Sequence, residues 1–117
     1  MNTYTISPSK NSTKKYDVSQ LNSKKKITSF GAKGYSDYTK PTENNEKKKE
    51  NYIKRHSVNE DWNDLSKAGT WARYILWNKP TINESIKNME QKFQVKIVKK
   101  EILRNSKKWY FGTTTTN

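Results

Sequence analysis

Residues 55–64 contain the side chains best suited to acid–base chemistry. His56 is the only histidine of the chain; it follows Arg55 and precedes Glu60 and Asp61. An imidazole oriented by a carboxylate can act as a general acid or base. Nothing in the pattern supplies a nucleophile beside it, and one histidine in a chain without cysteine makes a poor transition-metal site. We therefore expect these residues to brace a loop through charge-assisted hydrogen bonds.

Four carboxylates raise the alternative of a magnesium site: Asp37, Glu60, Asp61 and Asp64. Nucleases hold Mg²⁺ through such oxygen ligands. Exposure to solvent explains adjacent acidic residues on a loop more simply. We accordingly expect no metal, no cofactor and no catalytic residue, and a metal-dependent nuclease is the least favoured function.

The charge of the chain is its strongest overall feature. Lys and Arg number 24 against 11 acids, which gives +13. Residues 1–57 carry 13 basic and 5 acidic groups (+8), residues 58–93 carry 5 of each, and residues 94–117 carry 6 and 1 (+5). A neutral centre with basic flanks favours a polyanionic partner, above all nucleic acid. The predicted phosphate contacts are the lysine runs, Lys24, Lys25, Lys26, Lys47, Lys48, Lys49, Lys99, Lys100, Lys107 and Lys108.

Aromatic residues provide either a core or a stacking surface for bases. The chain has four Trp, seven Tyr and three Phe, but few other apolar residues, since hydrophobic residues make up only 30%. A domain of this composition needs tryptophan in its core, and we expect Trp71 and Tyr74 there. Trp62 and Trp77 lie near segment ends and fit either role. Trp109 lies among lysines outside the neutral centre, so it is the better stacking candidate.

The elements that must position these residues indicate one small α+β domain. A length of 117 residues favours a single domain. We expect a disordered arm over residues 1–13, a folded domain over 14–104, and a basic, low-complexity tail over 105–117. The lack of cysteine suits a reducing compartment, and no apolar run reaches the length of a membrane span or a signal peptide.

Within the domain, the pattern predicts a β-ribbon, helices and a final strand. Residues 14–30 read as a hairpin and residues 46–56 as a helix. Residues 70–79 read as a second helix, with Thr70 as its N-cap and Pro80 stopping it. Thr81 and Glu84 form a capping box for a third helix, whose apolar stripe is Ile82, Ile86, Met89 and Phe93. Residues 94–103 favour a strand that completes the sheet.

The segment FGAKGYSDYT (residues 30–39) resembles a phosphate cradle only superficially, because it lacks the GxxxxGK[ST] pattern. We expect Gly31 and Gly34 to permit a tight backbone path between the ribbon and the helices. Tyr35 and Tyr38 are predicted to pack toward the tryptophans. Asp37 is predicted to cap the turn or to accept a hydrogen bond from Arg55.

The order of motifs FGAKGYSDYT, YIKRH (52–56), EDW (60–62), AGTWARYILWNKPT (68–81) and INESI (82–86) carries a resemblance. Over roughly residues 14–93, the chain resembles a family of small, basic, uncharacterised proteins of nucleocytoplasmic large DNA viruses, the giant viruses of algae and amoebae. The resemblance implies a viral origin and a shared fold, without an activity. The residues that carry it as a structural signature are Phe30, Gly31, Gly34, Tyr35, Asp37, Tyr38, Arg55, His56, Trp62, Trp71 and Trp77.

The expected function is therefore that of a small, basic, non-enzymatic viral protein. It binds nucleic acid, DNA or RNA, without sequence specificity, in the virion or in the cytoplasm of the infected host cell, where it assists genome packaging. The alternative is a structural or adaptor protein, a minor virion component whose neutral aromatic centre docks on another viral or host protein. No membrane insertion is expected.

Overall fold

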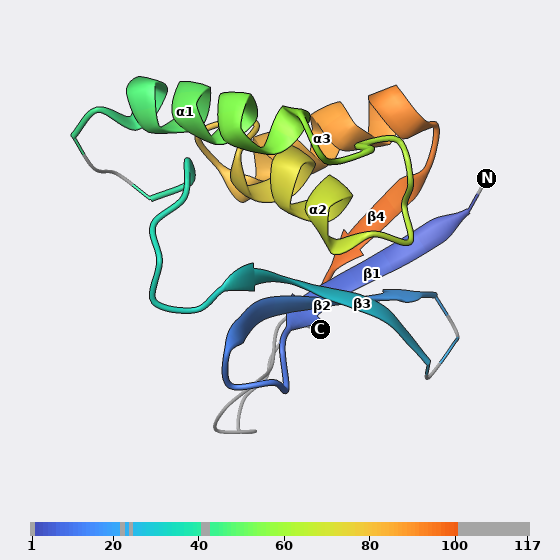
Figure 1. Cartoon of the computed structure of the whole chain (residues 1–117). Coiled ribbons are helices and arrows are strands. Elements are labelled where there is room, and N and C mark those ends of the chain that lie inside the picture. Colours follow the sequence, from blue (N-terminus) through green and yellow to red (C-terminus); the bar gives the residue numbers. More distant parts are fainter. Residues whose placement is uncertain (1, 22, 24, 41–42, 101–117) are drawn as a thin grey trace.

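The computed structural model describes residues 2–21, 23, 25–40 and 43–100. Its four strands are β1 (Thr3–Pro8), β2 (Lys14–Gln20), β3 (Lys26–Ala32) and β4 (Lys96–Lys99). They form one mixed sheet in the order β3-β2-β1-β4, in which β1 is antiparallel to β2 and parallel to β4. The helices gather on one side of this sheet (Figure 1), so the predicted α+β class with a single domain is confirmed.

Strand β1 corrects the prediction of a disordered arm over residues 1–13. It lies inside the sheet, where it pairs with β2 on one side and β4 on the other. Tyr4 and Ile6 point into the core, and they alternate with the threonines at 3 and 5. Alternation of this kind marks a half-buried strand. The Ser/Thr-rich composition hid it, although threonine itself favours strands.

The predicted hairpin and the predicted last strand are both present. In the hairpin, Tyr16 lies opposite Phe30, and their rings stack with centroids 5.5 Å apart. A bulge interrupts the β2–β3 register between Val18 and Ser19. Strand β4 pairs with β1 and does not extend the hairpin directly, because β1 lies between them. The tail over 105–117 lies outside the described residues.

The second predicted helix begins earlier and is less regular than expected. It consists of α2 (Ala68–Trp71) followed without a break by the π-helical turn η1 (Ala72–Leu76). Thr70 is not its N-cap, which corrects the prediction; that position belongs to Lys67, whose side chain makes no capping bond. The Thr70 hydroxyl is fully buried and donates to the carbonyls of Asp64 (2.6 Å) and Asp61 (3.3 Å). It therefore ties the preceding loop to the helix.

The third helix, α3 (Ile82–Phe93), confirms its prediction closely. Thr81 is the N-cap, and its hydroxyl accepts from the backbone N–H of Glu84 at 3.2 Å. The Glu84 carboxylate in turn accepts from that hydroxyl at 2.9 Å. Ile86 and Met89 are buried, with Ile82 and Phe93 packed at the edge of the core.

The core lies between the sheet and the α2–η1–α3 layer. Trp71 is fully buried at its centre, 5.5 Å from the Tyr4 ring and 6.3 Å from the Phe30 ring between centroids. Met89 of α3 is likewise inaccessible to solvent. Because each aromatic side chain buries a large apolar area, this arrangement offsets the small number of aliphatic residues. Tryptophan is thus a core residue here, as predicted for Trp71.

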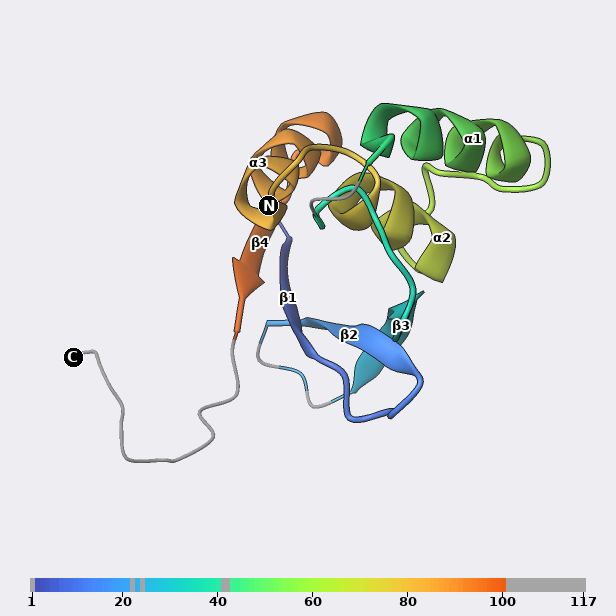
Figure 2. The same ribbon diagram turned by 90° about the vertical axis from the view of Figure 1, so that its left-hand side faces the viewer.

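Helix α1 (Asn45–Ser57) lies over α2 and η1, on the side away from the sheet (Figure 2). It confirms the helix predicted over 46–56. Tyr52 is its buried residue, and the Lys49 ammonium donates to the carbonyl of Asn78 at 2.7 Å. Within the described part of the chain, no helix is long and apolar enough to cross a membrane.

Candidate functional site

A cleft of 610 Å³ separates helix α1 from the sheet, and we call it the α1 cleft. The ends of β2 and β3 form one wall, and the segment after β3 crosses its mouth. Helix α1 and the α2–η1 helix form the rest. Its lining side chains include Lys14, Lys15, Phe30, Tyr35, Ser36, Asp37, Lys48, Asn51, Tyr52, Arg55, His56, Glu60, Ala68, Ala72, Leu76 and Trp77. Most of the aromatic and charged signature residues therefore meet in one place.

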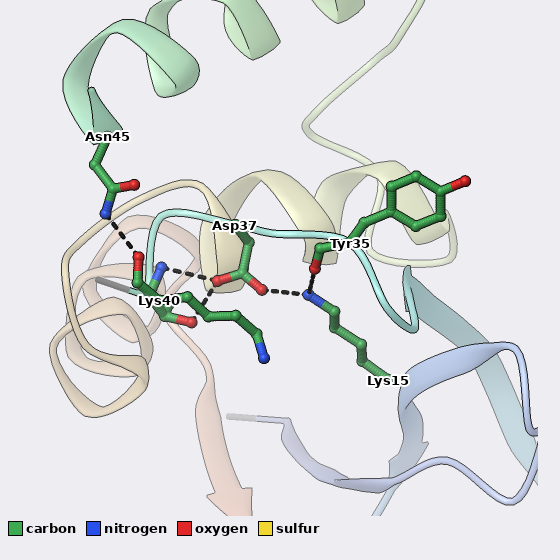
Figure 3. A network of polar contacts seen from close by, with 6 residues as sticks. Lys15, Tyr35, Asp37, Lys40 and Asn45 are labelled. Carbon is green, nitrogen blue, oxygen red and sulfur yellow. Dashed lines mark hydrogen bonds and ion pairs between the residues drawn. The ribbon is translucent and has the colours of Figure 1, made fainter. Parts of the chain in front are cut away.

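A buried ion pair fixes the segment at the mouth of the α1 cleft (Figure 3). The Lys15 ammonium lies 2.5 Å from Asp37 Oδ2 and donates to the carbonyl of Tyr35 at 2.7 Å. The two side chains are only 12% and 2% exposed. Asp37 also accepts from the backbone N–H of Thr39 at 2.8 Å, so it caps the turn as predicted. Its cationic partner is Lys15 and not Arg55, which was the other alternative considered for Asp37.

Two glycines allow the backbone to follow this path. Gly31 and Gly34 have φ angles of +81° and +92°, a region that disfavours other residues. A Cβ on Gly31 would lie 2.8 Å from Leu76 Cδ1, whereas the space around Gly34 is open. Gly31 is thus required by packing as well as by backbone conformation, and the predicted tight backbone path at the two glycines is confirmed.

Tyr35 and Tyr38 have opposite surroundings. Tyr38 is buried; its hydroxyl donates to Glu46 of α1, and the Lys49 ammonium lies 4.8 Å from its ring centroid. Tyr35 is 73% exposed, so the prediction that it packs toward the tryptophans is wrong. Its backbone is held by Lys15, and its ring is directed away from that ammonium (Figure 3).

His56 and Glu60 brace the loop after α1, as the sequence predicted. His56 Nδ1 is hydrogen-bonded to one carboxylate oxygen of Glu60, and the indole N–H of Trp62 donates to the other at 3.1 Å. Gly69 lies in α2, and a Cβ at this position would overlap the Glu60 carboxylate. The glycine of the AGTWA motif therefore makes room for this carboxylate. Arg55 is exposed and lines the cleft.

Stacked aromatic rings lie beside the cleft, and two of them, Tyr52 and Trp77, line it. Tyr52 stacks on Trp77 with centroids 4.7 Å apart and on Trp62 at 6.4 Å, nearly parallel in both cases. Burial, with the nearby Glu60 carboxylate adding to it, raises the pKa of the Tyr52 hydroxyl above its ordinary value. Tyr74 packs against Phe93, away from this stack, which agrees with its predicted core role. Trp62 and Trp77 thus position α1 against η1.

The four carboxylates considered for magnesium do not converge. Asp37 is paired with Lys15 and Glu60 with His56, while Asp61 accepts from the backbone of Asn63 at 3.0 Å. Asp64 accepts from the hydroxyl and N–H of Ser66, and these bonds hold its pKa below the ordinary value. Among the described residues, no three potential metal ligands form a group that could hold an ion.

The cations of the α1 cleft differ from the lysine runs of the sequence. The cleft is lined by Lys14, Lys15, Lys48 and Arg55 against two carboxylates, both of which are already paired. Only Lys48 of these belongs to a run. Lys14 and Lys15 were not predicted as contacts because they belong to a strand and not to a lysine run. The available signal for a cationic site was that two lysines stand side by side as the first residues of β2.

The remaining lysines of the runs lie elsewhere. Lys25, Lys26, Lys47, Lys99 and Lys100 are exposed on the hairpin, on α1 and at the end of β4. Lys49 is engaged with Asn78 and Tyr38, and burial lowers the pKa of its ammonium. It therefore docks α1 onto the domain. Lys24, Lys107, Lys108 and Trp109 lie outside the described residues.

Comparison with known proteins gives one match. Residues 4–56, from β1 to the end of α1, match the model of a family of unknown function (DUF5754). The match contains both the anchoring Lys15–Asp37 pair and the cationic face of α1, and it ends before α2. No curated protein and no solved structure was found to be similar to this chain.

Proposed function

We propose that this protein binds nucleic acid without catalysing a reaction, and that the α1 cleft is the centre of the binding surface. The observation that carries the proposal is the cleft itself, in which Lys14 and Arg55 line a hollow beside aromatic rings. Clefts lined by one sign of charge concentrate the field and attract ions of the other sign. With a net charge of +13, the partner is a polyanion.

The exposed lysines on the hairpin, α1 and β4 add a second, diffuse contribution. They lie on three separate elements, which suits contact with a flexible phosphate backbone better than recognition of a base pattern. The proposal therefore includes little sequence specificity. The motif resemblance supports extending the proposal to a role in the virion or in genome packaging, which mass spectrometry of purified virions tests.

Titration with labelled DNA and RNA over a range of salt concentrations tests the binding. We expect affinity to fall steeply with salt, because bound phosphates release their counterions. The variant Lys14→Gln/Arg55→Gln should weaken binding about tenfold or more and reduce the slope of log affinity against log salt by about 2. A matched control is Lys10→Gln/Lys87→Gln, which removes two exposed cations outside the cleft.

The outcomes separate the possible roles. Equal weakening by the two double variants would show that charge acts diffusely and that the cleft is not the centre. No binding to any nucleic acid at low salt would overturn the proposal. The adaptor function, in which the protein contacts another viral protein, would then be preferred.

A further inference from the structure

Tyr35 is an exposed aromatic ring on a tightly held backbone. Its side chain is 73% exposed, yet its carbonyl accepts from the nearly buried Lys15 ammonium at 2.7 Å. Its N–H donates to the carbonyl of Ala32 at 3.3 Å. An ion pair of this kind contributes little net stability, since both groups lose their hydration, but it fixes a geometry. The geometry fixed here is that of Tyr35 at the mouth of the cleft.

The surroundings of Tyr35 have two chemical characters. Ala68, Ala72, Leu76 and Trp77 supply apolar and aromatic surface within the cleft. Lys14 and Arg55 supply positive charge, and Ser36 and Asn51, both exposed, supply hydrogen-bonding groups. The volume of 610 Å³ is in the range of sites that hold one small organic molecule, roughly 300–1,000 Å³. An anion with a flat aromatic part matches all of these features.

We propose that the α1 cleft holds one unpaired nucleotide of a single strand. The Tyr35 ring stacks on its base, and Arg55 and Lys14 contact the phosphates on either side. This inference rests on the proposed function and adds a substrate class to it. In a duplex, both faces of each base are covered by neighbouring bases, so the ring has nothing to stack on. The protein consequently prefers single strands, with little dependence on base identity.

Fluorescence anisotropy with a labelled oligothymidine and with a duplex of the same length tests this inference. Both are measured at one salt concentration. We expect Tyr35→Ala to weaken single-strand binding roughly tenfold, which is the usual effect of losing one stacked aromatic, and to leave duplex binding unchanged. Tyr35→Phe keeps the ring face and should bind as the unchanged protein does. Val58→Ala, at another exposed apolar residue outside the cleft, is the control.

Two measurements keep this test independent of folding and of the proposed function. Because the Tyr35 side chain is mostly in solvent, its variants should melt at the same temperature as the unchanged protein. Equal affinity for single strand and duplex, or no effect of Tyr35→Ala on single strands, would overturn the inference. If Lys14→Gln/Arg55→Gln still weakened binding in that case, the proposed nucleic-acid binding would be retained and only the preference for single strands would be rejected. If no nucleic acid bound at all, both would fail together.

Discussion

The two sides of the α2–η1 helix are built from different interactions. Toward the sheet, Trp71 packs against Tyr4 and Phe30 in an apolar core. Toward α1, the contacts are a Tyr52–Trp77 stack and individual polar bonds. Apolar burial is non-directional and sums over many atoms, whereas each polar bond fixes one geometry and gains little net free energy. We infer that the sheet side supplies the stability and the α1 side positions the cleft.

The difference also predicts which side opens first. Regions with few apolar contacts and isolated polar bonds open at lower free energy than the core. Helix α1 contributes one buried residue, Tyr52, which is still 7% exposed, whereas the sheet side encloses Trp71, Phe30 and Ile6 completely or nearly so. The α1 cleft therefore has one rigid wall and one wall able to adjust to a ligand.

The largest expected effect is on the sheet side. Trp71→Ala removes the side chain at the centre of the core and should lower the free energy of unfolding by about 4 kcal/mol. For a small domain this is a large share of the total. Urea unfolding followed by circular dichroism measures the change. A loss of less than about 1 kcal/mol would contradict the assignment of stability to this side.

A smaller, more local effect is expected from Asp37→Asn. The variant leaves the nearly buried Lys15 ammonium without its counter-charge and should cost about 3 kcal/mol. Hydrogen exchange should show lost protection in residues 33–40 and in α1 before β1 is affected. The double variant Lys15→Met/Asp37→Asn, which removes both charges but keeps an oxygen to cap the turn, should recover stability but not nucleic-acid binding. Equal loss of protection throughout the sheet would mean that the two sides are one cooperative unit.

The smallest expected effect concerns acid stability and the outer face of the sheet. Burial alone would raise the pKa of Asp17, but hydrogen bonds from Ser29 and Ser9 and from the Lys10 N–H outweigh it and leave that pKa below the ordinary 3.8. A carboxyl group with a depressed folded-state pKa stabilises the protein above its unfolded value, and the contribution is lost as the pH falls through the folded one.

Asp17→Asn should therefore cost about 1 kcal/mol at neutral pH and flatten the loss of stability below about pH 4. Thermal melts of both proteins from pH 7 to pH 2 measure this. An unchanged acid transition in the variant would show that the sheet side gains nothing from this polar cluster, which would sharpen the contrast between the two sides further.

Local patterns made part of this molecule predictable. Helix α3 follows from its capping box and apolar stripe, and the His56–Glu60 contact follows from a spacing of four residues at the end of a helix. Strand β1 was not recognised, because composition was given more weight than the alternation of Tyr4 and Ile6. The irregular helix start at Lys67 carries no capping side chain that a sequence could reveal.

The α1 cleft itself depends on contacts between distant parts of the chain. Lys15 and Asp37 are 22 residues apart, and only the register of the hairpin and the turn at Gly31 bring them together. Lys14 and Lys15 are not conspicuous in the sequence, because two charged residues in a strand are expected to face the solvent. The sequence therefore predicted the turn cap by Asp37 but not its ion pair with Lys15.

The pairing of β1 with β4 has a consequence for how the chain folds during synthesis. Strand β1 is made before its two partners, yet one of its edges is completed only when residues 96–99 have left the ribosome. The β1–β2–β3 meander can form early, but until then it exposes an unpaired edge and the apolar face against which the helices will pack. Contacts so distant in sequence slow folding and leave such edges open to other chains. The interval between the synthesis of β3 and that of β4 is thus the one in which this sheet is most exposed to aggregation.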